Sequence, residues 1–301
     1  MRALLEHEVL LVTGKGGVGK SVVAAAAARR AATQGKRVLL LEFEEVSRAA
    51  PLFGRAGAPE EPEQVAPGLW LMGFDLMHSL RSFALDQLRL KPLVDLALRN
   101  DSVRGFFLAM PAIKSILFLY KLYQLRRDGE RFDLIVCDLP TSGFVAGLYG
   151  VPLMLGQIFR IGPLAETVRE MADLLQRDGR AGLVLVTLAE EMPVVETIEL
   201  AKDLEERHGR KVAAVVVNGL YARALSDPQW AALEPLRGSQ DRGTEALLWA
   251  ADVIQRRARR AEGLLEQLRG SLKTAPLLLP HLFKRNLTLE DIDQLAEQLP
   301  A

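Results

Sequence analysis

The chain has 301 residues, of which 49% are hydrophobic and 25% charged, a composition typical of a globular protein with a sizeable core. Its 38 basic residues balance 38 acidic ones, which argues against nucleic acid or an anionic membrane as the main partner. A single cysteine, Cys137, excludes an intrachain disulfide and a Cys-x-x-Cys metal clip. No apolar run reaches the ~18 residues of a transmembrane helix, and no signal core opens the chain, so we expect a cytoplasmic protein.

Apolar, β-prone runs alternate with helical patterns along the chain. Several of these runs are continuous in Val, Ile and Leu, as expected of strands that are covered on both faces. The alternation predicts right-handed βαβ crossovers, and hence an α/β fold with a mostly parallel sheet and helices on both faces. The first helix is expected over residues 22–35, ending at Gly35. The predicted strands are residues 8–13, 37–42, 69–74, 133–138, 182–188, 212–218 and 275–280.

Two stretches are predicted to be helical without intervening strands. The first covers about residues 76–130, is punctuated by Pro92 and Pro111, and is interpreted as a helical insertion. The second comprises residues 228–238 and 243–268, with a short Gly/Ser loop between them. Because no repeat or low-complexity segment interrupts the pattern, we expect residues 1–301 to form a single domain that contains the insertion.

The segment 13-TGKGGVGKS-21 lies between the first predicted strand and the first predicted helix, and it matches two nucleotide-binding patterns. Its glycines fit the dinucleotide pattern G-x-G-x-x-G, and residues 14–21 fit the phosphate-loop pattern G-x-x-x-x-G-K-[ST]. In a phosphate loop, Lys20 neutralises the β- and γ-phosphates and the Ser21 hydroxyl binds Mg²⁺. A dinucleotide site instead requires an acidic residue at the end of the second strand, where Glu42 stands. Spacing alone leaves both interpretations open.

A second carboxylate separates the two interpretations. Asp138 ends the predicted strand 133–138, which is where a phosphate-loop enzyme carries its other acidic group on the Mg²⁺ side. Residues 139–143 are expected to form a flexible loop that responds to the γ-phosphate. A dinucleotide site or a simple glycine turn explains neither Lys20-Ser21 nor Asp138. We therefore predict a phosphate-loop fold that binds a nucleoside triphosphate with Mg²⁺.

Neither pattern requires Lys15, the second residue of the loop. The sequence G-K-G-G-x-G-K-[ST] is the deviant Walker A motif, and on this motif the chain resembles the ArsA-like ATPases. That family includes arsenical-pump subunits and tail-anchored-protein targeting factors, and it lies close to the MinD/ParA ATPases. The resemblance implies hydrolysis of ATP and a dimer, with the same chain or a related ATPase, in which Lys15 contacts the partner's phosphate.

The resemblance extends over nearly the whole chain. Residues 42–54 occupy the place of the family's switch I, and residues 138–152 resemble its switch II. Glu44 falls on the family's water-positioning aspartate, so the implied catalytic residues are Lys15, Lys20 and Glu44. Because the longer glutamate displaces the carboxylate, hydrolysis is expected to be slow or to depend on a partner. An alternative gives the water-positioning role to Glu42.

The resemblance also implies a set of nucleotide and metal ligands. Asn218 is positioned like the family's adenine-reading asparagine, and residues 279–283 resemble the loop that covers the base. The metal ligands implied are Ser21 and Asp138. The nucleotide contacts implied are Gly14, Lys15, Gly16, Gly17, Val18, Gly19, Lys20, Ser21, Val22, Asn218, Pro280, His281 and Leu282.

Two departures limit the functions that the resemblance implies. The chain has no Cys-x-x-Cys for a zinc ion shared by two subunits, as in the eukaryotic targeting factor. With Cys137 as its single thiol it also lacks a thiolate site for trivalent arsenic, which disfavours an arsenite pump. The basic run 256–260 is interpreted as a solvated helix face rather than a nucleic-acid patch.

Two apolar segments could serve a partner. Residues 106–125 and 144–159 are apolar almost all round, and in ArsA-like ATPases helices at these places form a nucleotide-gated surface for a hydrophobic client. Packing of these helices on one another is the equally weighted alternative. The favoured function is thus a Mg²⁺-dependent ATPase that controls a hydrophobic client or membrane-protein partner. The alternative is a positioning module with weak hydrolysis that acts with a paralogous partner.

Overall fold

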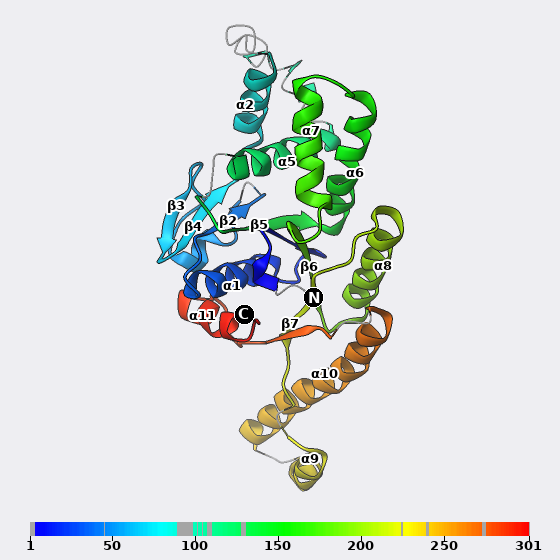
Figure 1. Ribbon diagram of the computed structural model, residues 1–301. Coiled ribbons are helices and arrows are strands. Elements are labelled where there is room, and N and C mark those ends of the chain that lie inside the picture. Colours follow the sequence, from blue (N-terminus) through cyan, green and yellow to red (C-terminus); the bar gives the residue numbers. More distant parts are fainter. Residues whose placement is uncertain are drawn as a thin grey trace.

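The computed structural model describes residues 4–44, 46–88, 99–100, 102–103, 105–106, 110–127, 131–223, 225–238, 241–272 and 275–300. One eight-stranded sheet runs through these residues in the order β3-β4-β2-β5-β1-β6-β7-β8 (Figure 1). Neighbouring strands are parallel, apart from the antiparallel pair of β3 with β4 at one edge. The predicted α/β fold with a mostly parallel sheet is confirmed.

All seven predicted strands are present, with small differences at their ends. An eighth strand, β3, was not predicted, because it is short, largely exposed and lies at the sheet edge, so its residues show no hydrophobic period. The strands are β1 Val9–Gly14, β2 Val38–Glu42, β3 Glu63–Ala66, β4 Leu69–Gly73, β5 Leu134–Thr141, β6 Ala181–Leu188, β7 Ala214–Leu220 and β8 Leu277–Pro280.

Helices cover both faces of the sheet, as Figure 1 shows. The first helix begins two residues earlier than expected and ends at Thr33. The predicted insertion contains α2 and α5, and much of the chain between them lies outside the described residues. The helices are α1 Lys20–Thr33, α2 Leu76–Leu88, α5 Pro111–Arg127, α6 Ser142–Ile158, α7 Pro163–Gln176, α8 Glu191–His208, α9 Asp227–Ala232, α10 Arg242–Leu272 and α11 Leu289–Glu297, with the 3-10 turns η1 Leu4–Glu6, η2 Ala50–Phe53 and η3 Glu234–Leu236.

The two faces of the sheet explain why the strands are continuously apolar. In β1, Leu10 and Val12 pack in a core with α1 and α11, whereas Val9 and Leu11 pack in a second core with α5, α6 and α7. Every residue of such a strand is therefore buried, and no polar alternation is possible. This arrangement leaves the carboxyl ends of the parallel strands as the edge where polar groups gather.

Residues 139–143 do not form the predicted flexible loop. β5 continues to Thr141, and α6 begins directly at Ser142. Thr13 at the end of β1 is fully buried and donates its hydroxyl to the Pro140 carbonyl oxygen at 2.9 Å. The residues that follow Asp138 are therefore held against the strand that leads into the glycine loop.

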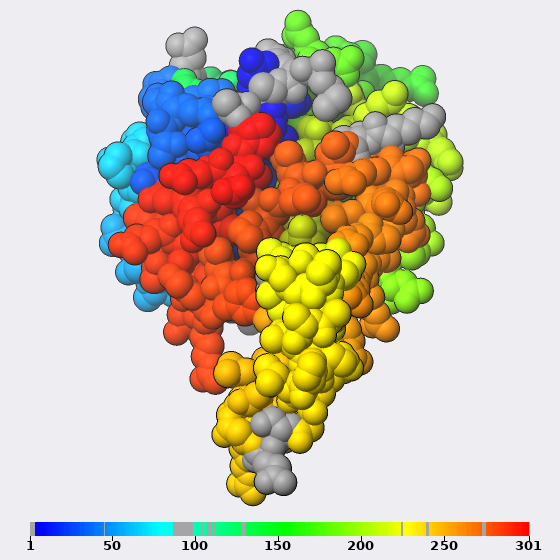
Figure 2. Space-filling model, turned by 90° about the horizontal axis from the view of Figure 1, so that it is seen from below, coloured from blue at the N-terminus to red at the C-terminus, as the bar shows by residue number. Residues whose placement is uncertain are grey.

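The N-terminal part of the long helix α10 projects from the layered body. Figure 2 shows α9 and the beginning of α10, in yellow and orange, projecting from the rest of the molecule. The C-terminal part of α10 returns to the body, where Leu265 and Leu268 pack with Val194 of α8 and Val217 of β7. Within the described ranges, no helix combines the length and apolar character needed to cross a bilayer.

Candidate nucleotide-binding site

The glycine loop lies between β1 and α1, at the centre of the sheet. Two of its glycines are required by close approach of the chain. A Cβ on Gly14 would lie 2.1 Å from the Val186 carbonyl oxygen, and one on Gly19 would lie 2.2 Å from Asn218 Nδ2. Gly19 also has a φ of 85°, which side chains rarely adopt. The loop can therefore lie this close to Val186 of β6 and Asn218 of β7 only because these positions lack side chains.

The loop leads straight into the N-terminus of α1, where backbone N–H groups and the helix dipole favour an anion. Lys20 is the first residue of this helix, and its Nζ donates to the Lys15 carbonyl oxygen at 3.3 Å. Its ammonium group is thus folded back over the loop. This geometry fits a phosphate cradle in which Lys20 supplies the positive charge.

Asp138 lies beside this cradle and is 8% exposed. Burial raises the pKa of its carboxyl to about 7, a hydrogen bond with Ser21 opposes the rise, and the charge of Glu42 adds to it. Its Oδ1 is buried and has no hydrogen-bond partner among the residues that the structure describes. A buried carboxylate oxygen without a partner, next to a serine hydroxyl, is the oxygen donor set that suits Mg²⁺.

Glu42 and Asp138 lie next to each other, because the parallel register of β2 and β5 pairs them. The Glu42 carboxylate is nevertheless occupied. Its Oε1 accepts the backbone N–H groups of Arg48 and Ala49 at 2.8 Å each, and its Oε2 accepts the Ser47 hydroxyl. Glu42 therefore holds the loop that follows β2, which argues against both alternatives considered for it, the ribose ligand and the water-positioning base.

Glu44 is two residues beyond Glu42 and is exposed. Its charge contributes to the raised pKa of Asp138, so it lies within electrostatic reach of that carboxyl. The next residue, Glu45, lies outside the described residues. Among the residues that the structure describes, none forms a hydrogen bond or ion pair that holds the Glu44 side chain in position.

Lys15 is held within its own chain. Its Nζ lies 2.5 Å from Glu196 Oε1 on α8, and the two side chains are 39% and 37% exposed. The two residues are separated by 181 positions in the chain, so no local pattern could have predicted this ion pair. Lys15 therefore stands at the accessible surface of the loop, paired with a carboxylate that it would have to leave in order to reach another subunit.

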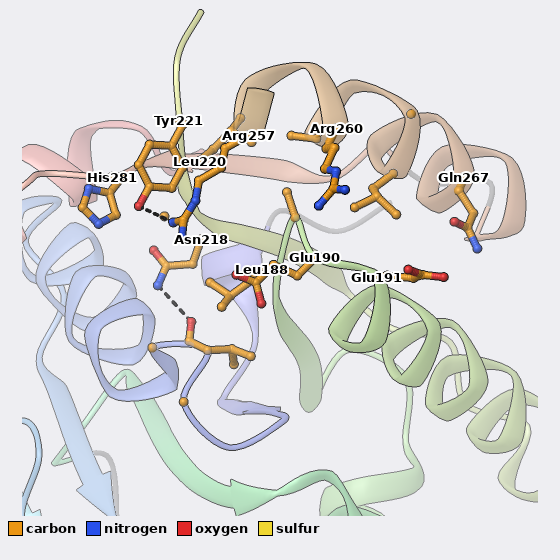
Figure 3. Close-up of a pocket in the computed structure, with 18 residues that line it drawn as sticks. Leu188, Glu190, Glu191, Asn218, Leu220, Tyr221, Arg257, Arg260, Gln267 and His281 are labelled. Carbon is orange, nitrogen blue, oxygen red and sulfur yellow. Dashed lines mark hydrogen bonds between the residues drawn. The ribbon is translucent and has the colours of Figure 1, made fainter. Parts of the chain in front are cut away.

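A cavity of about 900 Å³ opens beside the loop residues Gly17, Val18 and Gly19 (Figure 3). Asn218 faces this cavity at the end of β7, and its Nδ2 donates to the Val18 carbonyl oxygen at 3.0 Å. The Asn218 Oδ1, which has no hydrogen bond within the described ranges, can accept one from a base. The cavity is therefore bordered both by the glycine loop and by an amide suited to reading a purine, whereas Lys20, Ser21 and Asp138 do not line it.

Of the predicted base-covering residues, His281 lines the cavity, while Pro280 and Leu282 do not. Leu282 packs instead against the core that contains α1. The His281 ring stacks on Tyr221, with centroids 4.7 Å apart and planes inclined by 15°. Val22, also predicted as a contact, likewise packs on that core and not against the cavity.

Among the cavity residues that the sequence interpretation missed are Tyr221, Arg257 and Arg260. Tyr221 follows Asn218 by three positions, and Arg257 and Arg260 come from α10. The run 256–260 was interpreted as a solvated face, and Arg257 and Arg260 are indeed exposed, but both also line the cavity, which was not predicted. Their place depends on how α10 packs, and the sequence around them contains no signal for that packing.

Comparison with known proteins agrees with this geometry. The family described as anion-transporting ATPases matches residues 7–177, which include the glycine loop, Asp138 and α6. The ATPase BagA of Mycobacterium tuberculosis is 29% identical over 219 residues, 69% of this chain and 64% of its own length. The arsenical pump-driving ATPase of Acidiphilium multivorum is 28% identical over 238 residues, which cover 72% of this chain and 40% of that protein. The chain belongs to the anion-transporting ATPase family, the ArsA-like phosphate-loop ATPases.

Proposed function

We propose that this chain is a Mg²⁺-dependent ATPase in which ATP-driven dimerisation controls an apolar protein-binding surface. The observation that carries the proposal is the cluster of Lys20, Ser21 and Asp138 at the start of α1. A buried Oδ1 of Asp138 without a partner among the described residues, beside the Ser21 hydroxyl, gives a place for the metal. Family membership supports the use of ATP.

Each residue of the cluster has a distinct task in this proposal. Ser21 and Asp138 hold Mg²⁺, and Lys20 binds the β- and γ-phosphates together with the loop N–H groups. The metal, when bound, neutralises charge that develops on the phosphate oxygens. Glu44 orients the attacking water. Since it is exposed and unanchored, we expect a low basal rate that rises when a partner orders the segment after β2.

The ion pair of Lys15 with Glu196 suggests how dimerisation begins. Because both side chains are more than one third exposed, the pair contributes little to stability, about 0–1 kcal/mol. The phosphate charge of a second subunit can therefore draw Lys15 away from Glu196. We propose that this exchange places Lys15 on the partner's nucleotide, in a dimer of two copies or of this chain with a related ATPase.

Replacement of Lys15 by alanine tests the dimeric mechanism. We expect ATP affinity to change less than about threefold, while steady-state turnover falls by about 100-fold or more, because charge at the transition state is lost. Turnover is measured as phosphate release with saturating Mg-ATP, and dimer formation by light scattering. Glu196→Gln is the matched control, because it breaks the same ion pair but retains the lysine. If Glu196→Gln reduced turnover as much as Lys15→Ala, the cross-subunit role would be wrong.

The apolar segments differ in their surroundings. In α5 the centre of the helix is buried, and Leu117, Phe118 and Leu119 are fully buried. The described part of residues 106–125 is thus mostly packed inside the protein, as expected if these helices pack on one another, although Phe106 is 63% exposed. In α6, Pro152 is the last buried residue, and every residue from Leu153 to Ile161 is exposed or half-buried.

We propose that the second half of α6 is the client surface. The large exposed side chains of this half and of the residues just after it are Leu153, Met154, Ile158, Phe159 and Ile161, with Ile161 at 89%. Because α6 begins at Ser142, directly after the strand that carries Asp138, a shift at the nucleotide is transmitted along one continuous element. Pro152 lacks the N–H for a helical bond, which makes the junction between the buried and exposed halves deformable.

A double substitution tests the client surface. Leu153→Ser with Ile158→Ser should reduce binding of an apolar 20-residue peptide by at least about 10-fold, because two large side chains lose their apolar contacts. Binding is measured by fluorescence anisotropy of the labelled peptide with Mg-ATP and with Mg-ADP. Leu247→Ser is the control, since Leu247 is 74% exposed on the distant part of α10. Equal losses in both variants would contradict a specific surface on α6.

One observation favours a second function. No described carboxylate is held in place to activate water, because Glu42 is bound by its own loop and Glu44 is exposed. The chain could then act as a nucleotide-dependent positioning module, with catalysis supplied by a paralogous subunit. Steady-state turnover of the purified chain distinguishes the two, since robust hydrolysis by the chain alone contradicts a positioning module.

A further inference from the structure

The basic run 256–260 divides into two classes of arginine according to the face of α10 on which each lies. Arg256 forms an ion pair with Asp252, and Arg259 donates to Asp227 at 2.7 Å. Arg257 and Arg260 face the cavity instead. Figure 3 shows Arg260 directed from α10 into the cavity, on the side of Leu188 and Glu190. Arg256 and Arg259 are thus neutralised by nearby aspartates, whereas Arg257 and Arg260 form no ion pair with a described carboxylate.

Arg257 is bound to the wall of the cavity, and in the described part of the chain it forms no ion pair with a carboxylate. Its Nη1 donates to the Tyr221 hydroxyl at 2.8 Å, and its guanidinium lies 5.0 Å from the Tyr221 ring centroid. Tyr221 in turn stacks on His281, which the Phe283 ring contacts edge-on at 4.6 Å. Arg257 therefore fixes the orientation of an aromatic platform beside Asn218.

Arg260 has no hydrogen bond or ion pair with any residue in the described part of the chain. Glu190 and Glu191 line the same cavity from the start of α8, yet neither forms an ion pair with it. The next residue of α10, Ala261, is 4% exposed, and Leu264 lines the cavity. The helix around Arg260 is therefore packed against the protein, which fixes the position of the arginine backbone. A guanidinium without a partner among the described residues, aimed into a cavity that Gly17, Val18 and Gly19 of the loop also line, is suited to bind an anion.

We propose that α10 supplies a cationic wall to the nucleotide site, in which Arg260 binds the ribose and α-phosphate of the nucleotide and Arg257 positions Tyr221 for the base. This proposal rests on the proposed function, since it assumes that the cavity holds a nucleotide. The position follows from the layout of the cavity. The loop and Lys20 take the β- and γ-phosphates, Asn218 and His281 take the base, and Arg260 enters the cavity from α10 on the side of Leu188 and Glu190 (Figure 3).

The two arginines line up with the cavity because of helical spacing. Residues 257, 260, 264 and 267 recur at three and four positions and so share one face of α10. Residues 256 and 259 lie on a neighbouring face that turns outward and meets Asp252 and Asp227. The run 256–260 therefore contains the two arginines that are proposed to serve the nucleotide, and two outward arginines that can serve as matched controls.

Equilibrium titration of the full chain with Mg-ATP and with Mg-ADP tests the role of Arg260. Arg260→Ala should weaken both nucleotides by the same factor, about 10- to 100-fold, because a charge-assisted bond is lost that does not involve the γ-phosphate. Arg260→Lys should recover part of the affinity. Arg259→Ala, which removes an equal charge from the outward face, should change it less than twofold. An Arg260→Ala variant that binds both nucleotides as well as Arg259→Ala does would overturn the proposal.

The role of Arg257 is tested by a double-mutant cycle with Tyr221. Arg257→Ala and Tyr221→Phe should weaken Mg-ATP by similar factors, and the double variant should be no worse than either, because both remove the same hydrogen bond. Additive losses would contradict the positioning role. Lys20→Ala distinguishes a failure of the role of Arg260 from a failure of the proposed ATPase function. If Lys20→Ala abolishes binding while Arg260→Ala has no effect, the cationic wall is wrong and the ATPase proposal stands; if wild-type protein binds neither nucleotide, the proposed function itself fails.

Discussion

Substitution of Lys20 by alanine is expected to abolish ATP binding, with a loss of affinity of more than about 100-fold. Lys20 is the first residue of α1, and its ammonium group lies 3.3 Å from the Lys15 carbonyl oxygen, over the glycine loop. Without it, the loop N–H groups and the helix dipole face two phosphates without a compensating cation. Calorimetric titration with Mg-ATP measures the loss, and thermal unfolding checks that the fold is retained.

Lys202→Ala provides the control for this substitution. Lys202 is exposed on α8, so its removal changes the net charge equally but leaves the loop intact. We expect its affinity for ATP to match that of the unmodified chain. Retention of ATP affinity in Lys20→Ala, at the level of Lys202→Ala, would exclude the phosphate-loop mechanism and with it the proposed ATPase.

Replacement of Asp138 by asparagine is expected to have two opposite effects. Mg²⁺-dependent turnover should fall by more than about 100-fold, since a metal ligand is lost. The metal-free protein should become more stable at pH 8. The pKa of Asp138 rises from 3.8 to about 7 on folding, mainly by burial, so above pH 7 the ionised carboxyl destabilises the folded state. A shift of this size corresponds to an upper bound of about 4 kcal/mol.

The stability gained by Asp138→Asn is expected to depend on pH. Because the pKa in the folded state is raised, the penalty is fully present above about pH 7 and disappears as the pH falls toward 4, where Asp138 is protonated in both states. The stability gained by Asp138→Asn should therefore shrink between pH 8 and pH 5. Urea unfolding in the presence of a chelator measures it.

Asp133→Asn is the matched control, because its effect has the opposite sign. The hydrogen bond from Arg37 lowers the pKa of Asp133, which lies just before the other end of β5, so its carboxylate favours the folded state. Asp133→Asn should therefore destabilise the chain at pH 8. If Asp138→Asn were destabilising as well, Asp138 would serve the fold and not a metal site.

The fold, and the positions of the glycine loop and Asp138 within it, could be predicted from the sequence because both depend on local signals. Continuous apolar runs predicted seven strands, since a strand that is covered on both faces has no polar position. The loop 13–21 and Asp138 could be placed because they end or follow such strands. Residues 139–143 were predicted as a loop and belong to β5 and α6 instead, since the contact of Thr13 with Pro140 that holds them there is not local.

The sequence by itself thus determined the α/β fold and placed the glycine loop and Asp138 at the ends of strands, because helix and strand periods and glycine spacing can be recognised within a few residues. Only the tertiary structure decided which distant groups meet that loop. Lys15 pairs with Glu196 across 181 positions, and Arg257 and Arg260 reach the cavity because α10 packs on α8 and β7. Helix periodicity defines the faces of such a helix, but the face that turns toward a site depends on packing against residues far along the chain.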